Sequence, residues 1–193
     1  MPLPTSDGDV RLVERAVSGD SSAFGLLYDK YQEQIFRFIY VKVGRREDAE
    51  DIAAQVFLQA LTNLSDWRDL GYPFSSWLYR IARNAVADFY RSSKNTASLE
   101  DLPEEQMGLI ARELEVDTDI ALSIHRVRAC MTTIKEEYQD VLLMRFVDDM
   151  SIRDTATAIG KSEGATKLLT HRAVRALREK LKKTSGKISG DVQ

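Results

Sequence analysis

The chain has 193 residues, of which 44% are hydrophobic and 30% are charged, and its net charge at pH 7 is −3. This length allows one or two small cores and excludes a large enzyme fold. One cysteine, Cys130, excludes an internal disulfide and a cysteine-based zinc site. The first nine residues do not resemble a signal peptide, and no stretch approaches the roughly 18 apolar residues needed to span a bilayer. We expect a cytoplasmic protein without direct membrane insertion.

The charges are distributed unevenly along the chain. Residues 1–94 carry a net charge of −1, residues 95–125 a net charge of −7, and residues 126–193 a net charge of +5. Within the last part, residues 161–187 hold nine basic and two acidic side chains. The acidic middle therefore masks a basic end that is suited to nucleic acid.

Apolar residues recur at helical spacing and predict an all-α fold with two small domains. The first blocks cover residues 24–38, 49–64 and 74–89, and they predict a helical bundle over residues 10–94 with breaks at Gly44, at residues 69–73 and at residues 92–95. Residues 95–119 form an acidic linker, which predicts domains that are tethered and not fused. A second helical domain is expected at residues 120–184, followed by a disordered tail at residues 185–193.

Residues 151–160 (SIRDTATAIG) and 161–172 (KSEGATKLLTHR) predict two helices around a tight turn. Ser151 and Ser162 are suitable N-caps, and Gly160 supplies a left-handed residue at the end of the first helix. Ala156 is small enough for a close helix crossing, and the seam is expected at Ile152, Ile159, Leu169 and Ala173.

Burial of that seam leaves Glu163, Lys167, His171 and Arg172 on the outer face of the second helix, where a recognition helix meets a major groove. A basic run that includes Arg175 follows. The alternative is an ordinary helical hairpin with a solvated basic face.

Residues 74–91 (FSSWLYRIARNAVADFYR) interleave aromatic and basic side chains. The face opposite the apolar positions carries Trp77, Arg80, Asn84 and Arg91, with Tyr79 and Arg83 beside it. Unpaired bases stack on aromatic rings while arginines hold phosphates, so this pattern suits single-stranded DNA. The pattern fits equally well with rings that complete the core and arginines that are solvated.

The helix predicted at residues 47–64 turns Asp48, Asp51 and Gln55 outward on one line, with Leu58 beside them. Acidic residues in a first turn often do no more than offset the helix dipole. The alternative is a docking surface for a partner with basic residues.

Together and in this order, residues 48–57 (DAEDIAAQVF), 74–84 (FSSWLYRIARN) and 138–178 resemble the group IV (extracytoplasmic-function, ECF) sigma factors of RNA polymerase, in the sigma-70 family. The resemblance covers most of residues 20–92 and 126–183. It implies a region 2 domain, a region 4 helix-turn-helix domain and promoter-specific initiation of transcription. The implied partners are core RNA polymerase, through its β and β′ subunits, promoter DNA and an anti-sigma factor.

The resemblance also implies residue roles. The polymerase contacts are Asp48, Asp51, Gln55 and Leu58. The contacts to the minus-ten element are Trp67, Arg68, Trp77, Arg80, Arg83 and Asn84, with residues 65–72 as the loop that captures an unstacked base. The contacts to the minus-thirty-five element are Glu163, Lys167, His171, Arg172 and Arg175. Thr155, Thr166 and Lys135 depart from the usual family residues, so the upstream sequence preference does not transfer.

Two other functions compete with this interpretation. A repressor or activator that forms no holoenzyme explains the helix-turn-helix equally well, but it leaves the acidic helix and the Trp- and Arg-rich helix unexplained. An enzyme is disfavoured because His125 and His171 lie far apart and no nucleophile motif, phosphate loop or metal-ligand cluster accompanies them. We expect no cofactor, no metal ion and no small-molecule substrate.

Overall fold

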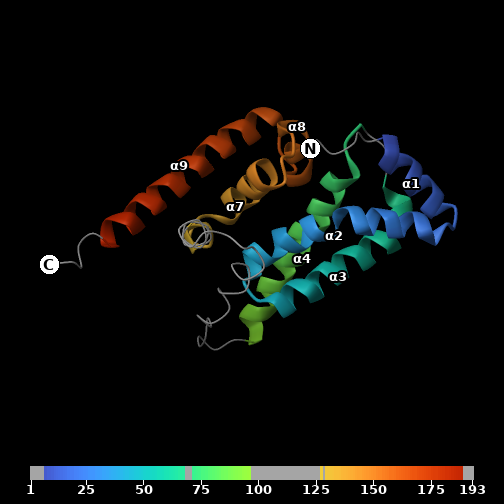
Figure 1. Ribbon diagram of the computed structural model, residues 1–193, viewed down its shortest axis with the longest axis horizontal. Coiled ribbons are helices and arrows are strands. Elements are labelled where there is room, and N and C mark those ends of the chain that lie inside the picture. The colour runs from blue at the N-terminus through green and yellow to red at the C-terminus, as the bar shows by residue number, and fades with distance from the viewer. Residues whose placement is uncertain (1–6, 68–70, 97–126, 128, 189–193) are drawn as a thin grey trace, which may run out of the picture.

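The computed structural model describes residues 7–67, 71–96, 127 and 129–188, and every regular element in these ranges is helical (Figure 1). The predicted all-α class is confirmed. None of the described helices is both long enough and apolar enough to cross a bilayer.

The amino-terminal domain comprises residues 7–96. Its elements are α1 (Asp7–Val17), α2 (Ser21–Val43), α3 (Arg46–Thr62), the 3-10 turn η1 (Leu64–Asp66) and α4 (Phe74–Thr96). Asp20 caps α2 by accepting the Ser22 N–H at 3.1 Å, and Gly44 ends it with a φ of 82°. These local signals set the two ends of α2.

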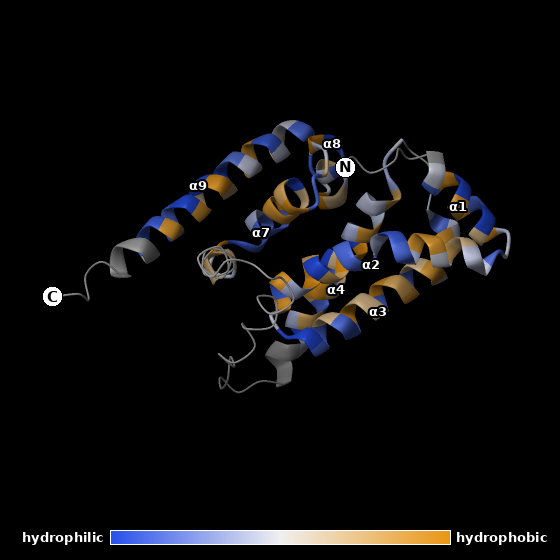
Figure 2. Ribbon diagram, viewed as in Figure 1, coloured by the Kyte–Doolittle hydropathy of each residue, from blue (hydrophilic) through white to orange (hydrophobic). Residues whose placement is uncertain are grey.

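The core of this domain lies between α2, α3 and α4. Phe38 of α2 and Tyr79 of α4 are fully buried, and their rings meet edge to face with centroids 5.2 Å apart. The hydropathy colouring in Figure 2 shows the apolar faces of these three helices turned toward one another. This packing holds α4, the aromatic and basic helix, rigidly against the acidic helix α3.

Two features of this domain differ from the sequence prediction. The helix α1 was not predicted, and the domain starts before residue 10; α1 is held by Asp9, which is buried and accepts hydrogen bonds from Lys30 and Tyr31. The predicted break at residues 92–95 is wrong, because α4 continues to Thr96. Ser92 is accommodated by donating its hydroxyl to the Phe89 carbonyl at 2.9 Å. Residues 97–119 of the predicted linker lie outside the described residues.

The carboxy-terminal domain follows. Residues 129–131 are helical, and after them come α7 (Glu136–Leu142), the π-helical turn η3 (Leu143–Val147), α8 (Ile152–Ile159) and α9 (Glu163–Ile188). The predicted caps are confirmed: Ser151 accepts the Asp154 N–H at 3.0 Å, Ser162 accepts the Ala165 N–H at 3.2 Å, and Gly160 has a φ of 68°.

The end of α9 corrects the predicted tail. Residues 185–188 are helical, whereas the sequence prediction placed disorder from residue 185 onward. The preceding residues 175–183 are rich in Arg, Lys and Leu, which favour helix, so the hydrogen-bond ladder continues past Ser185 and Gly186. Figure 1 shows α9 projecting well beyond the rest of its domain.

The two domains pack against each other, which corrects the prediction that they are only tethered. Helix α8 of the second domain lies against α4 of the first, and buried residues of both domains form one continuous cluster. Polar bonds cross the same contact, for example from the Ser76 hydroxyl to the Asp154 carbonyl at 3.1 Å.

Candidate nucleic-acid and polymerase surfaces

The outer face of α9 is open to solvent. All five side chains predicted to contact the minus-thirty-five element are exposed: Glu163, Lys167, His171, Arg172 and Arg175. On the opposite side, Thr166 and Ala173 are fully buried, and the Thr166 hydroxyl donates to the Ser162 carbonyl at 2.9 Å. The helix-turn-helix therefore presents a row of polar and basic groups that no described residue covers.

The face of α3 predicted to bind polymerase is also accessible. Asp51, Gln55 and Leu58 are exposed, with Leu58 at 65%, while Asp48 is half-buried. Asp48, Asp51 and Gln55 line a groove whose other wall is formed by Ala85, Asp88 and Phe89 of α4. Three carboxylates around an apolar floor suit a partner that has basic residues next to apolar ones.

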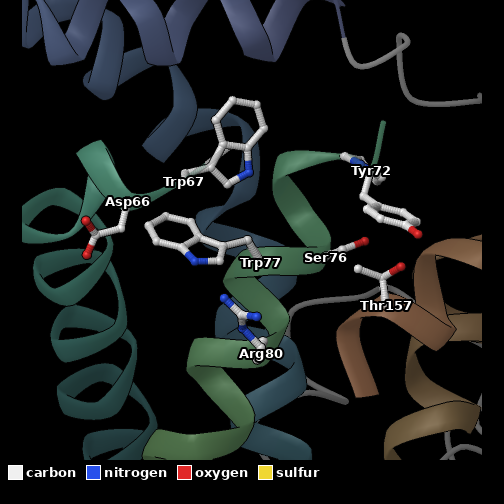
Figure 3. A pocket seen from close by; sticks show the side chains of 8 residues that line it. Asp66, Trp67, Tyr72, Ser76, Trp77, Arg80 and Thr157 are labelled. Atoms are coloured by element: carbon white, nitrogen blue, oxygen red, sulfur yellow. The ribbon is translucent and has the colours of Figure 1, made fainter. Parts of the chain in front are cut away.

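A second groove lies between the turn after α3 and the start of α4 (Figure 3). Trp67 and Trp77 flank Phe74, with ring centroids 5.9 and 5.4 Å from it. Figure 3 shows the two indoles on one side of the groove and Tyr72 on the other. The exposed Arg80 adds a cation to the same lining. Flat apolar rings next to a guanidinium provide a stacking surface and a phosphate contact.

The six residues predicted to contact the minus-ten element do not share one environment. Trp67, Trp77 and Arg80 come together in this groove, and Asn84 is exposed one helical turn after Arg80. Arg83 faces elsewhere: its Nε donates to Asp140 of α7 at 2.7 Å. Arg68 lies outside the described residues.

A cluster of buried charges was missed by the sequence analysis. Asp140 accepts from Lys42 and Arg83, and Asp148 accepts from Arg37 at 3.0 Å and from the Tyr79 hydroxyl at 2.6 Å. Tyr79, predicted beside the outer face of its helix, is fully buried. The only signal in the sequence was an aspartate in each of two apolar stretches around α7 and η3.

Burial changes the acid–base properties of this cluster. Desolvation raises the pKa of Asp148 above its usual value, although the hydrogen bonds from Tyr79 and Arg37 act in the opposite direction. Burial and then the neighbouring Asp148 carboxylate raise the pKa of Tyr79 well above 10. Tyr79 is therefore a hydrogen-bond donor at neutral pH.

Comparison with known proteins assigns the two domains. The family description "Sigma-70 region 2" matches residues 27–96, and "Sigma-70, region 4" matches residues 124–177. The ECF RNA polymerase sigma factor BldN of Streptomyces coelicolor is 36% identical over 183 residues, which cover 90% of this chain and 67% of that protein. The chain belongs to the ECF RNA polymerase sigma factors. The ECF sigma factor SigW of Bacillus subtilis is 27% identical over 178 residues, which cover 88% of this chain and 95% of SigW.

Solved structures share the fold of this ECF sigma factor. CnrH, solved in complex with the cytosolic domain of CnrY, superimposes with a TM-score of 0.70 at 24% identity, covering 91% of this chain and 98% of CnrH. The sigma factor RpoE of Bartonella quintana, solved with the anti-sigma factor NepR, gives a TM-score of 0.64 at 16% identity, covering 82% of this chain and 96% of that chain.

As an ECF sigma factor, the chain binds core RNA polymerase and promoter DNA and directs transcription initiation. The competing interpretation, a repressor or activator that forms no holoenzyme, is disfavoured because the amino-terminal domain matches sigma region 2.

Proposed function

We propose that three separate surfaces divide the work of this sigma factor. The α3 face docks on core polymerase, the groove at the start of α4 holds the unpaired minus-ten element, and the outer face of α9 reads the minus-thirty-five duplex. The observation that carries this proposal is the presence of three accessible and chemically different surfaces on two domains that match regions 2 and 4.

The assignment of the α3 face to polymerase rests on its chemistry. Asp48, Asp51 and Gln55 line a groove rimmed by carboxylates, and Leu58 adds an exposed apolar side chain nearby. DNA phosphates are repelled by such a rim, whereas basic side chains of a protein partner pair with it. This surface is therefore the polymerase-docking surface of our proposal.

We assign the groove at the start of α4 to unpaired DNA because aromatic side chains line it. Trp67 and Trp77 are half-buried, and each indole packs on Phe74 and also lines the groove. Arg80 and Asn84 extend the surface along α4 with one cation and one amide. A base that is unstacked from the promoter finds an apolar stacking surface here and a charge for its phosphate.

The assignment of the α9 face to duplex DNA rests on geometry. A helix that follows a tight turn and exposes Lys167, His171 and Arg172 toward solvent can enter the major groove. Arginine pairs with guanine edges or phosphates, and the positive end of the helix adds to the attraction for phosphate. Arg175 lies one turn further along and is placed for backbone contact.

An anti-sigma factor is the proposed regulator. The described surface retains large exposed apolar side chains, including Leu58 at 65%, Leu61 at 50% and Phe146 at 63%, and these suit a protein partner. Such a partner would compete with polymerase for the same apolar side chains. Copurification of a small protein that competes with core polymerase supports this proposal, and equal activity with and without every neighbouring gene product contradicts it.

We also propose that the chain acts without catalysing a reaction and works in the bacterial cytoplasm, where RNA polymerase and the chromosome are found. Support for the first point comes from its family, whose role is promoter selection.

The test of the three-surface proposal separates polymerase affinity from DNA affinity. Asp51→Arg reverses a charge in the docking groove and is expected to weaken binding to core polymerase by about tenfold or more, since like charges at an interface cost several kcal/mol. Binding of the free chain to duplex DNA should not fall. Glu14→Arg, which reverses an exposed charge on α1, is the matched control and should leave both affinities unchanged.

A loss of polymerase affinity that is equal for Asp51→Arg and Glu14→Arg contradicts the docking assignment. The thermal unfolding temperature of both variants is also measured, because a lower temperature would show that affinity is lost through unfolding.

A further inference from the structure

A buried carboxylate on α1 lies outside the three surfaces assigned above. The side chain of Asp9 is 3% exposed and accepts a hydrogen bond from the Lys30 ammonium at 2.5 Å. Its second carboxylate oxygen accepts from the Tyr31 hydroxyl. A buried charge is tolerated only when it is paired and hydrogen-bonded. Asp9 of α1 therefore holds two donors of α2 in place.

Both partners of Asp9 act on one aromatic ring. The hydroxyl of Tyr31 bonds to Asp9, and the Lys30 ammonium lies over the Tyr31 ring, 4.9 Å from its centroid. Burial and the hydrogen bond to Asp9 raise the pKa of Tyr31 well above its ordinary value, so the hydroxyl remains a donor at neutral pH. The Tyr31 ring is thus fixed both at its hydroxyl and on one face.

The Tyr31 ring packs on the residue that supports the groove at the start of α4. Tyr31 and Phe74 are both buried, and their ring centroids lie 6.0 Å apart. Trp67 and Trp77 pack on the same Phe74 ring and line the groove, where Figure 3 shows their indoles close together. A continuous series of contacts therefore runs from Asp9 through Tyr31 and Phe74 to the two indoles.

Helix α1 supports the same groove by a second route. It lies against η1 (Leu64–Asp66), which leads directly into Trp67 (Figure 1). Val13 of α1 and Leu64 of η1 are both buried in the core cluster. Asp66, the last residue of η1, lines the groove. The position of Trp67 thus depends on α1 through the turn that precedes it and through the ring on which it packs.

These contacts of α1 are directed at one of the three surfaces. The extensive contacts of α1 are with α2 and η1, and no described residue of α1 lines the groove that we assign to polymerase. A carboxylate that only stabilised the fold would affect all three surfaces alike, and only through unfolding. A carboxylate that orients the indoles should affect one surface while the chain remains folded. The two roles can therefore be separated by experiment.

We propose that Asp9 is a positioning residue for the groove at the start of α4: by holding Tyr31 against Phe74, it fixes the two indoles on which an unpaired base stacks. The functional part rests on the role proposed above for that groove, while the positioning of the indoles does not depend on DNA. A binding site loses affinity when the residues that support it are loosened. Helix α1 thus contributes to capture of the minus-ten element, although the buried Asp9 does not touch DNA.

The test uses the tryptophans of the groove as reporters. The chain contains two tryptophans, Trp67 and Trp77, so selectively excited tryptophan fluorescence reports on this groove alone. In the full-length chain, Asp9→Ala removes the acceptor of both donors and is expected to raise the acrylamide quenching constant by about 1.5-fold or more, because local opening becomes easier. Tyr31→Phe keeps the ring and loses one hydrogen bond, so it should raise quenching by a smaller factor.

Asp20→Ala is the matched control. It removes a carboxylate from the connection between the same two helices, together with the bonds that Asp20 accepts from Ser22 and Arg15. Loss of this N-cap lowers stability without removing a bond on the route to Phe74. The control should keep the quenching constant of wild type. An equal rise in Asp9→Ala and Asp20→Ala overturns the positioning role, as does unchanged quenching in both Asp9→Ala and Tyr31→Phe.

Unfolding is checked by far-ultraviolet circular dichroism at the temperature of the fluorescence measurement. If Asp9→Ala loses helix, Tyr31→Phe decides against the same control, since it keeps the aromatic ring that packs on Phe74. Unchanged quenching in a folded Tyr31→Phe variant then overturns the proposal.

A DNA-binding arm separates the positioning of the indoles from the function of the groove. In the holoenzyme, Asp9→Ala should bind an unpaired oligonucleotide that carries the minus-ten sequence about fivefold more weakly than wild type, since a misplaced ring stacks poorly on a base. Affinities for core polymerase and for duplex DNA should be unchanged. Increased quenching without weaker binding of the oligonucleotide overturns the functional part. Unchanged binding in Trp77→Ala counts against the function of the groove itself, while quenching still reports on positioning by Asp9.

Discussion

The sequence supported a DNA-binding role more strongly for the outer face of α9 than for the outer face of α4, and the two faces also differ in the folded chain. All five predicted residues on α9 are exposed. On α4, Arg80 and Asn84 are exposed, Trp77 is half-buried, Arg83 is bound to Asp140, and Tyr79 is fully buried. Two kinds of contact cause this difference. The carboxy-terminal domain packs on α4 and binds Arg83 and Tyr79 through Asp140 and Asp148. Tyr79 and Trp77 also pack on Phe38 and Phe74 of their own domain. A helical face can be predicted from periodicity only where no distant segment packs on it.

The largest loss of DNA affinity is expected from a substitution on α9. Arg172→Ala should weaken binding to the minus-thirty-five duplex by about tenfold, since one good arginine contact to a base is worth about 1–3 kcal/mol. Arg11→Ala, which removes an exposed arginine from α1, is the control in duplex-binding measurements by fluorescence anisotropy.

A smaller effect is expected on α4. Arg80→Ala should weaken binding of the holoenzyme to an unpaired minus-ten strand by about fivefold, in line with the loss of one charge-assisted phosphate contact. An unchanged affinity would contradict the assignment of the groove at the start of α4 to the minus-ten strand.

The turn between α8 and α9 can be destabilised without changing a side chain on the outer face of α9 or of α4. Gly160 has a φ of 68° and open space around it, so Gly160→Ala should lower the free energy of unfolding by about 1 kcal/mol through backbone strain alone. Gly164 lies in the first turn of α9, also in open space, and Gly164→Ala should raise stability by up to about 1 kcal/mol. Chemical denaturation of both variants checks the opposite signs.

The smallest effect concerns pH. The pKa values of Tyr31 and Tyr79 are raised above 10 in the folded chain by burial and by Asp9 and Asp148, respectively. The unfolded chain releases these protons first, so this contribution to stability is complete below pH 10 and is lost as the pH rises further. Tyr79→Phe should flatten the decline in the free energy of unfolding above pH 10, and an unchanged slope contradicts this origin.

The features that the sequence predicted well, such as the helix caps, depend on residues close together in the chain. Ser151, Gly160 and Ser162 act on neighbours a few residues away, and the structure places each as expected. The exposed and buried faces of α9 follow from the spacing of its own apolar residues.

The features that the sequence did not predict depend on contacts between residues far apart in the chain. Asp148 meets Arg37 across 111 positions, and Asp140 meets Lys42 across 98. No pattern within one helix shows such a pairing, so these buried ion pairs and the burial of Tyr79 were missed. The helix α1 was missed for a related reason, since a buried carboxylate accepting from α2 holds it in place.

The most direct test of the central claim is transcription by core RNA polymerase, with and without the chain, on fragmented genomic DNA of the organism that encodes it, with the RNA 5′ ends mapped. We expect a discrete set of start sites that require the chain, share two upstream sequence elements and disappear with Asp51→Arg. Start sites that are identical with and without the chain would contradict it.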